Sequence, residues 1–136
     1  MTVAQAAAEY TALVAPYNKA LNDLYDYLQR TGRVLSSAEL EKAKPLAGAL
    51  ADANRAFSIG LQKALWPSDA QGAVVDLSAA ATRQQADFRG MAQAGTPEAF
   101  LAADDAARAK NDDDTGAAEL LRQKLGLGET KATDLD

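Results

Sequence analysis

The side chains of this chain that could carry chemistry are acids and tyrosines, because the 136-residue sequence contains neither histidine nor cysteine. Without imidazole or thiolate groups, the common zinc sites, thiol catalysis and haem with ordinary His or Cys ligands are excluded. A di-iron site is excluded as well, since it needs Glu-x-x-His on two helices. Catalytic serine, phosphate-loop and dinucleotide motifs are also missing. We therefore expect a non-enzymatic protein with no catalytic residue and no cofactor.

The acids occur as close pairs and as one run. They are Asp23 with Asp26, Glu39 with Glu41, Asp104 with Asp105, and Asp112 to Asp114. Catalysis by paired carboxylates needs two acids across a cleft with different pKa values. Most of these acids lie off the apolar stripes of the predicted helices, which indicates solvated surface charge. Residues 111–116 weakly match a calcium loop, but Arg122 occupies the twelfth position, where an EF-hand needs glutamate. We expect no metal site beyond weak cation binding to the acidic run.

The composition favours helices and one domain. The chain has 32 alanines and 17 leucines against five valines and one isoleucine, whereas a sheet core would use β-branched and aromatic residues. The net charge is −5, and residues 112–136 contain seven acids and three bases. No basic stripe is present, so we expect no nucleic-acid partner. No run of 18 apolar residues is present, so we expect no transmembrane segment.

Apolar residues recur every three or four positions along four segments, which predicts helices at about 3–29, 37–65, 69–94 and 97–125. Ser36 and Glu39 form a capping box before the second helix, and Thr96-Pro97 is a strong start for the fourth. Gly116 marks the place where the fourth helix would break.

Short connections make consecutive helices antiparallel, so we predict an all-α, up-down-up-down four-helix bundle over residues 1–125. Residues 126–136 are predicted to form a flexible acidic tail. The alternative is three long helices and a short fourth that breaks at Gly116.

Polar residues interrupt the apolar stripes at similar heights of the predicted bundle. This polar layer consists of Tyr17, Asn54, Gln84, Asn111 and Asp114. The layer is either a network of mutual hydrogen bonds that fixes helix register, or a small polar cavity for a ligand. Buried amides without partners are destabilising, which favours the mutual network.

Three aromatic residues, Tyr25, Tyr27 and Trp66, fall off the predicted core or near a helix end. Exposed aromatic side chains are typical of surfaces that bind another protein. We therefore consider them as a candidate partner surface, with ordinary packing as the alternative.

The segments YTALVAPYNKAL, from Tyr10 to Leu21, and AAELLRQKLGL, from Ala117 to Leu127, resemble the opening and closing helices of small alanine-rich exported domains of actinobacteria. Many of those are uncharacterised lipoproteins or secreted proteins. The resemblance implies an exported location and carries no activity. We do not expect residues 1–15 to act as a signal peptide, because they have no basic n-region and no lipobox cysteine.

The expected function is thus a helical module that binds another protein or a small ligand, as the soluble part of an exported protein. The alternative is a cytosolic homodimer with a structural or regulatory role.

Overall fold

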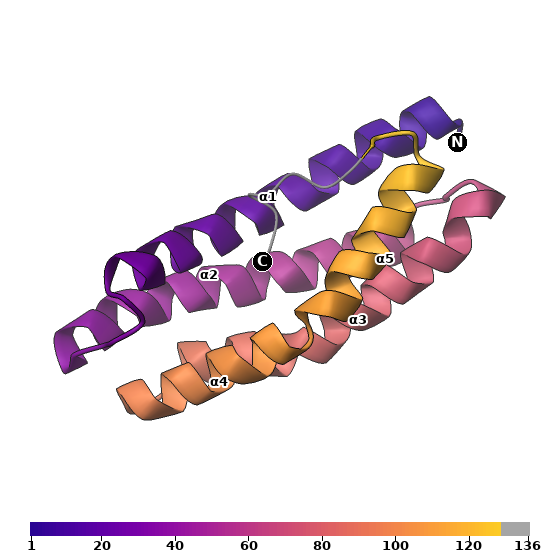
Figure 1. Cartoon of the computed structure of the whole chain (residues 1–136). Helices are drawn as coiled ribbons and strands as arrows, with labels where there is room; N and C mark the ends of the chain where they lie inside the picture. Colours follow the sequence, from indigo (N-terminus) through magenta and orange to yellow (C-terminus); the bar gives the residue numbers. More distant parts are fainter. Residues whose placement is uncertain (129–136) are drawn as a thin grey trace.

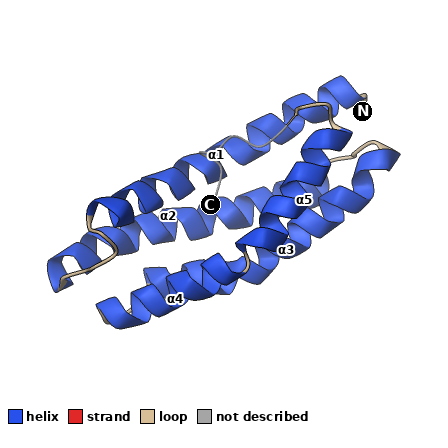
Figure 2. Ribbon diagram, in the orientation of Figure 1, coloured by secondary structure: helices blue, strands red, loops and turns tan. Residues whose placement is uncertain are grey.

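The computed structural model describes residues 1–128, which form five α-helices and no strand (Figure 2). The helices are α1 (Val3–Arg30), α2 (Ser37–Lys63), α3 (Ser68–Ala92), α4 (Pro97–Ala109) and α5 (Asn111–Lys124). The all-α prediction is confirmed. The single fourth helix predicted at 97–125 is wrong, because α4 and α5 replace it.

Side-chain caps fix where three of the helices begin. Thr2 Oγ1 accepts from the backbone N–H of Gln5 at 3.1 Å, and the Gln5 side chain accepts from the backbone N–H of Thr2 at 2.8 Å. Ser36 and Glu39 form the same reciprocal pair, as predicted, at 3.1 and 2.9 Å. The predicted N-cap at Thr96 is also confirmed. These caps satisfy backbone donors that a helix start leaves free.

A break at Lys110 separates α4 from α5. The Lys110 N–H donates to the carbonyl of Ala107, and its Nζ donates to Asp87 Oδ2 of α3 at 2.6 Å. Acids 112–114 occupy the first turn of α5, where the helix dipole favours negative charge. The predicted break at Gly116 is therefore wrong, since Gly116 lies inside α5.

The helices are arranged around α3. It packs against α2 along one side and against both α4 and α5 along the other, while α1 packs mainly against α2 (Figure 1). α1, α2 and α3 run in alternating directions, and α4 and α5, which share one general direction, both run opposite to α3 (Figure 1). α1 and α2 continue through the interior prolines Pro16 and Pro45. Within residues 1–128, no helix has the length and apolar content needed to cross a membrane.

The contact between α2 and α3 contains small and polar side chains. Ser58 Oγ lies 3.2 Å from Ser78 Oγ, and Gln62 Nε2 donates to Ser78 Oγ at 2.9 Å. A Cβ at Gly48 would lie 3.8 Å from the Cβ of Ala92. Small residues at these positions allow the two helices to approach closely along their length.

The predicted tail at 126–136 begins as an ordered helix end. Gly126 adopts φ +70, and the N–H of Leu127 donates to the carbonyl of Arg122 at 2.9 Å. A left-handed glycine followed by this hydrogen bond is a Schellman-type cap. Leu127 is half-buried against the core. The rest of the predicted tail, 129–136, lies outside the described residues.

Candidate functional site

A cavity of about 40 Å³ lies between α1 and α5, with α2 and α3 forming its floor. Its deep wall consists of buried side chains, namely Tyr10, Tyr17, Asn54, Phe57, Leu77, Ala81 and Asp114. Its rim consists of half-buried residues from α1 and α5, namely Val14, Asn18, Thr115, Ala118 and Arg122. The difference in burial places the mouth of the cavity between α1 and α5.

Aromatic rings form one part of the wall. The ring of Tyr17 stacks on that of Phe57, with centroids 5.5 Å apart and an interplanar angle of 20°. Tyr10 meets the same Phe57 ring edge-on at 6.2 Å. All three rings are buried and belong to α1 and α2, so their positions are fixed by the packing between these two helices.

Asn54 contributes a side-chain oxygen that receives no hydrogen bond from residues 1–128. Its side chain is 1% exposed, and Nδ2 donates to the Ala81 carbonyl at 2.9 Å and to Gln85 Oε1 at 2.7 Å. Gln85 is held in turn, because its Nε2 donates to the carbonyl of Ala51 at 3.0 Å. These bonds fix the amide orientation. Among the residues that the structure describes, none donates to Asn54 Oδ1.

Asp114 contributes a second acceptor of this kind. It is 5% exposed, and no donor from residues 1–128 reaches its Oδ1. Burial raises the pKa of Asp114 to about 7; the charge of Arg83 opposes this rise and that of Asp113 adds to it. Burial and the nearby Asp114 charge raise the pKa of Tyr17 well above its ordinary value. The Tyr17 hydroxyl therefore stays protonated at neutral pH, while Asp114 is close to its titration midpoint.

The predicted polar layer is divided between two places in the structure. All five of its residues are buried, but only Tyr17, Asn54 and Asp114 line the cavity. Gln84 lies at the junction of α4 and α5 instead, where its Nε2 donates to the Ala107 carbonyl at 2.8 Å and to Asn111 Oδ1 at 3.0 Å. Gln84 and Asn111 thus support the helix break rather than the cavity.

The predicted exposed aromatic surface is not present as a surface. Trp66 is only 7% exposed, and its Nε1 donates to the Leu61 carbonyl at 2.7 Å, which folds the indole back over the end of α2. Tyr25 and Tyr27 are half-buried and pack against the core. The prediction of exposure is therefore wrong for Trp66, and the other two rings are partly covered.

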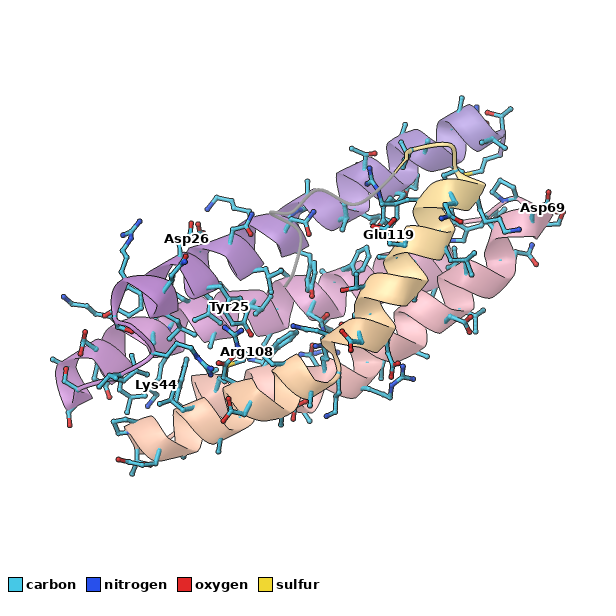
Figure 3. All side chains as sticks on the ribbon, in the orientation of Figure 1. Tyr25, Asp26, Lys44, Asp69, Arg108 and Glu119 are labelled. Atoms are coloured by element: carbon cyan, nitrogen blue, oxygen red, sulfur yellow. The ribbon has the colours of Figure 1, made fainter. Side chains whose placement is uncertain are left out.

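A second polar cluster joins the end of α1 to α4. Asp104 is 0% exposed and accepts hydrogen bonds from the Tyr25 hydroxyl at 2.7 Å, from Arg108 Nε at 3.1 Å and from Arg33 Nη2. The Arg108 guanidinium also lies 4.7 Å from the centre of the Tyr25 ring. Figure 3 shows Tyr25 and Arg108 in the space between α1 and α4.

The prediction of Asp104 as a surface acid is wrong. One indication was in the sequence, because Phe100 and Arg108 lie four residues before and after Asp104, on the same helix face. The contribution of Arg33 to this cluster was not predicted either. Arg33 has a positive φ of 61, which is unusual for a residue with a side chain, and it also pairs with Asp105 at 3.0 Å. Because two arginines and a tyrosine donate hydrogen bonds to Asp104, we interpret this cluster as a structural contact that links the end of α1 to α4.

Within residues 1–128, no group of three or more acidic side chains is placed to hold a metal ion. Comparison of the chain with protein-family models, curated proteins and solved structures finds no match. The function is therefore inferred from the geometry of the cavity itself.

Proposed function

We propose that this chain is a non-enzymatic helical module that binds a small polar ligand in the cavity between α1 and α5. The scaffold in this proposal is an antiparallel four-helix bundle in which α4 and α5 together make the fourth rod. One observation carries it: two buried acceptors, Asn54 Oδ1 and Asp114 Oδ1, belong to residues that line one cavity and receive no donor from the described residues. A buried polar atom without a partner costs about 1–3 kcal/mol, and a ligand donor would recover part of this.

The size of the cavity limits the ligand. A water molecule needs about 10–15 Å³ of such space, so 40 Å³ accommodates about three groups of that size. Sites for cofactors and drug-sized molecules are larger, at about 300–1,000 Å³. The ligand, or the end of it that enters the cavity, therefore has only a few non-hydrogen atoms.

The chemistry of the wall supports binding without catalysis. The raised pKa of Tyr17 keeps its hydroxyl neutral, so it serves as a hydrogen-bonding group rather than as a nucleophile. Asp114 is the acid in the wall, and carboxylate catalysis generally needs a second acid with a different role.

The test is to fill the cavity from its rim. Ala118→Leu places a larger apolar side chain at the mouth, whereas Ala117→Leu makes the same change on a residue that lines a different groove, between α3 and α5. The ¹⁵N-labelled chain would be titrated with small amides, alcohols, amines and carboxylates and followed by NMR. We expect at least one class to give saturable shifts in α1 and α5 that Ala118→Leu abolishes and Ala117→Leu retains. If no class binds, or if Ala118→Leu binds normally, the proposal is wrong.

A homodimer is the second candidate, and exposed apolar side chains favour it. Leu65 is 81% exposed and Val75 is 65% exposed, and both line one groove where α2 and α3 meet. Apolar side chains that gather on a surface are typical of protein interfaces. Light scattering at micromolar concentration would show a dimer that Leu65→Asp dissociates. A monomer for the unsubstituted chain would contradict this candidate.

A further inference from the structure

We infer that the ligand of the cavity is a small alkylammonium ion, bound by the Asp114 carboxylate, the Asn54 carbonyl oxygen and the aromatic rings of Tyr17 and Phe57. This inference rests on the proposed function, because it names the chemical class of ligand for the same site. Three independent properties of the wall support it: its hydrogen-bonding polarity, its charge and its aromatic content.

The hydrogen-bonding polarity requires a ligand that donates. The two atoms of cavity-lining residues that receive no donor from residues 1–128, Asn54 Oδ1 and Asp114 Oδ1, are both acceptors, and the Asn54 amide has already used both of its N–H donors. An ammonium group brings up to three N–H donors and no acceptor. A carboxylate ligand would instead add more acceptors to a wall that already has two in excess.

The charge of the site favours a cation. Ionised Asp114 is buried with little compensation, which is why its pKa is raised to about 7 in spite of Arg83. The other nearby cation, Arg122 at the rim, donates through Nε to the Gly128 carbonyl at 3.1 Å and through Nη2 to the Leu127 carbonyl at 3.0 Å. Since the segment after α5 holds this guanidinium, a cationic ligand would supply the counter-charge that Asp114 lacks.

The aromatic content favours an organic cation over a metal ion. Cations bind to aromatic faces within about 6 Å of the ring centre. Tyr17 and Phe57 form part of the wall and stack on each other, so a ligand would contact the face of either ring that points away from the stack. Leu77 and Ala81 would contact a short alkyl group. Calcium needs about six to eight oxygen ligands, and this mostly apolar wall is a poor match for such a set.

The experiment is an NMR titration of the full ¹⁵N-labelled chain with methylammonium chloride, at a pH above the pKa of Asp114. Potassium chloride, acetamide and sodium acetate would be titrated in parallel. We expect saturable shifts with methylammonium, and an affinity at least about tenfold weaker in Asp114→Asn, which corresponds to the loss of one charged contact. Asp112→Asn is the matched control: it removes an exposed acid of the same run and is expected to bind normally.

A pH series separates a direct charge contact from a structural role of Asp114. Because methylammonium would bind the ionised carboxylate, its affinity should fall about tenfold for each pH unit below the pKa of about 7. The residual binding of Asp114→Asn should show no such dependence. A pH profile that is the same in both proteins would overturn the inference.

The remaining outcomes distinguish this inference from the proposed function. Tighter binding of acetamide or acetate than of methylammonium would overturn the cationic ligand and leave the proposed function intact. A response to potassium equal to the response to methylammonium would point to an inorganic cation and overturn the assignment of an organic cation. If none of the four salts and solutes binds, the inference fails, and the wider panel then tests the proposed function.

A second variant tests the inference independently, in case Asp114→Asn does not fold. Phe57→Leu removes an aromatic face and keeps an apolar side chain at this position. We expect it to weaken methylammonium binding severalfold while acetamide is little affected. Circular dichroism would confirm that each variant is helical before it is titrated, and equal weakening of both solutes by Phe57→Leu would count against the aromatic contact.

Discussion

Asp104 and Asp114 are both buried acids of the C-terminal third of the chain, but their surroundings differ. Asp104 accepts hydrogen bonds from Tyr25, Arg33 and Arg108, whereas no donor from residues 1–128 reaches Asp114 Oδ1. A buried carboxylate that is fully paired holds structure together, and one that is partly unpaired retains capacity to bind. In the proposed function the same residue type therefore has two roles, and the neighbouring donors decide between them.

Asp104→Asn should lower the free energy of unfolding by about 2–3 kcal/mol, as measured by urea denaturation. The substitution leaves Arg33 and Arg108 beside a neutral amide, and breaking a buried ion pair costs about 3–5 kcal/mol. We expect a loss of about 2–3 kcal/mol, below the usual range for a buried ion pair, because the Arg33 and Arg108 side chains are 38% and 35% exposed and water compensates part of the lost interaction.

Asp105→Asn is the matched control for this prediction. Asp105 also pairs with Arg33, but its side chain is 69% exposed, so the change should cost less than about 0.5 kcal/mol. Equal losses in the two variants would show that the burial of Asp104 contributes nothing to the strength of the cluster.

The raised pKa of Asp114 predicts how stability depends on pH. The folded protein binds the proton more tightly than the unfolded chain, so this stabilising contribution is complete below about pH 4 and is lost as the pH rises through about 7. Each pKa unit corresponds to about 1.4 kcal/mol, so the loss amounts to about 4 kcal/mol. The difference in unfolding free energy between the unsubstituted chain and Asp114→Asn should change by this amount between pH 4 and 8. A constant difference would contradict the burial of an unpaired carboxyl.

At the scale of the helices, the break lies at Lys110, between α4 and α5, so Gly116 is an ordinary residue in the interior of α5. Gly116→Ala should therefore stabilise the protein by about 0.5–1 kcal/mol, since a Cβ there meets nothing within 4 Å and alanine has the higher helix propensity. Thermal unfolding would measure the change. Gly126→Ala is the control with the opposite expectation, because φ +70 at that position is strained for alanine. A destabilised Gly116→Ala would place a break there after all.

The first three helices were predictable from the sequence to within a few residues, because a regular apolar stripe runs over 3–30, 37–63 and 68–92 and a capping box marks the start of the second. The division of the fourth was missed for a physical reason. The apolar phase continues through the acidic run, so periodicity alone sees one helix. Acids in a first turn also mark a helix start, and residues 112–114 are such a start.

The site was predictable only in part. The stripe positions of Tyr17, Asn54 and Asp114 indicated burial, and the structure brings these three to one cavity. Whether Gln84 and Asn111 also line the cavity depends on the angle at which α5 crosses α3. This crossing angle follows from the helix break at Lys110, and the spacing of apolar residues does not reveal that break. The contacts of Asp104 were not predicted, because the adjacent acids Asp104 and Asp105 were expected to be solvated surface charge.

At the scale of the whole molecule, α5 has less support than α2 or α3. It has 14 residues, too few for a stable isolated helix, and it packs mainly against α3. Amide hydrogen exchange should therefore be faster in α5 than in α2 and α3, through local opening. Methylammonium should slow exchange in α5 selectively if it binds at the mouth. Uniform protection across all five helices would contradict this hierarchy.

The close contact between α2 and α3 has a consequence for how the chain folds. These helices share the most extensive contact in the structure and are joined by only four residues, 64–67, so little loop entropy is lost when they meet. Local contacts of this kind form early, which makes this hairpin the expected folding nucleus. Substitutions at Ser58 or Ser78 should then slow refolding, whereas changes in α5 should mainly speed unfolding. The part of the chain that is expected to assemble first would thus be distinct from α5, the helix that is expected to open locally.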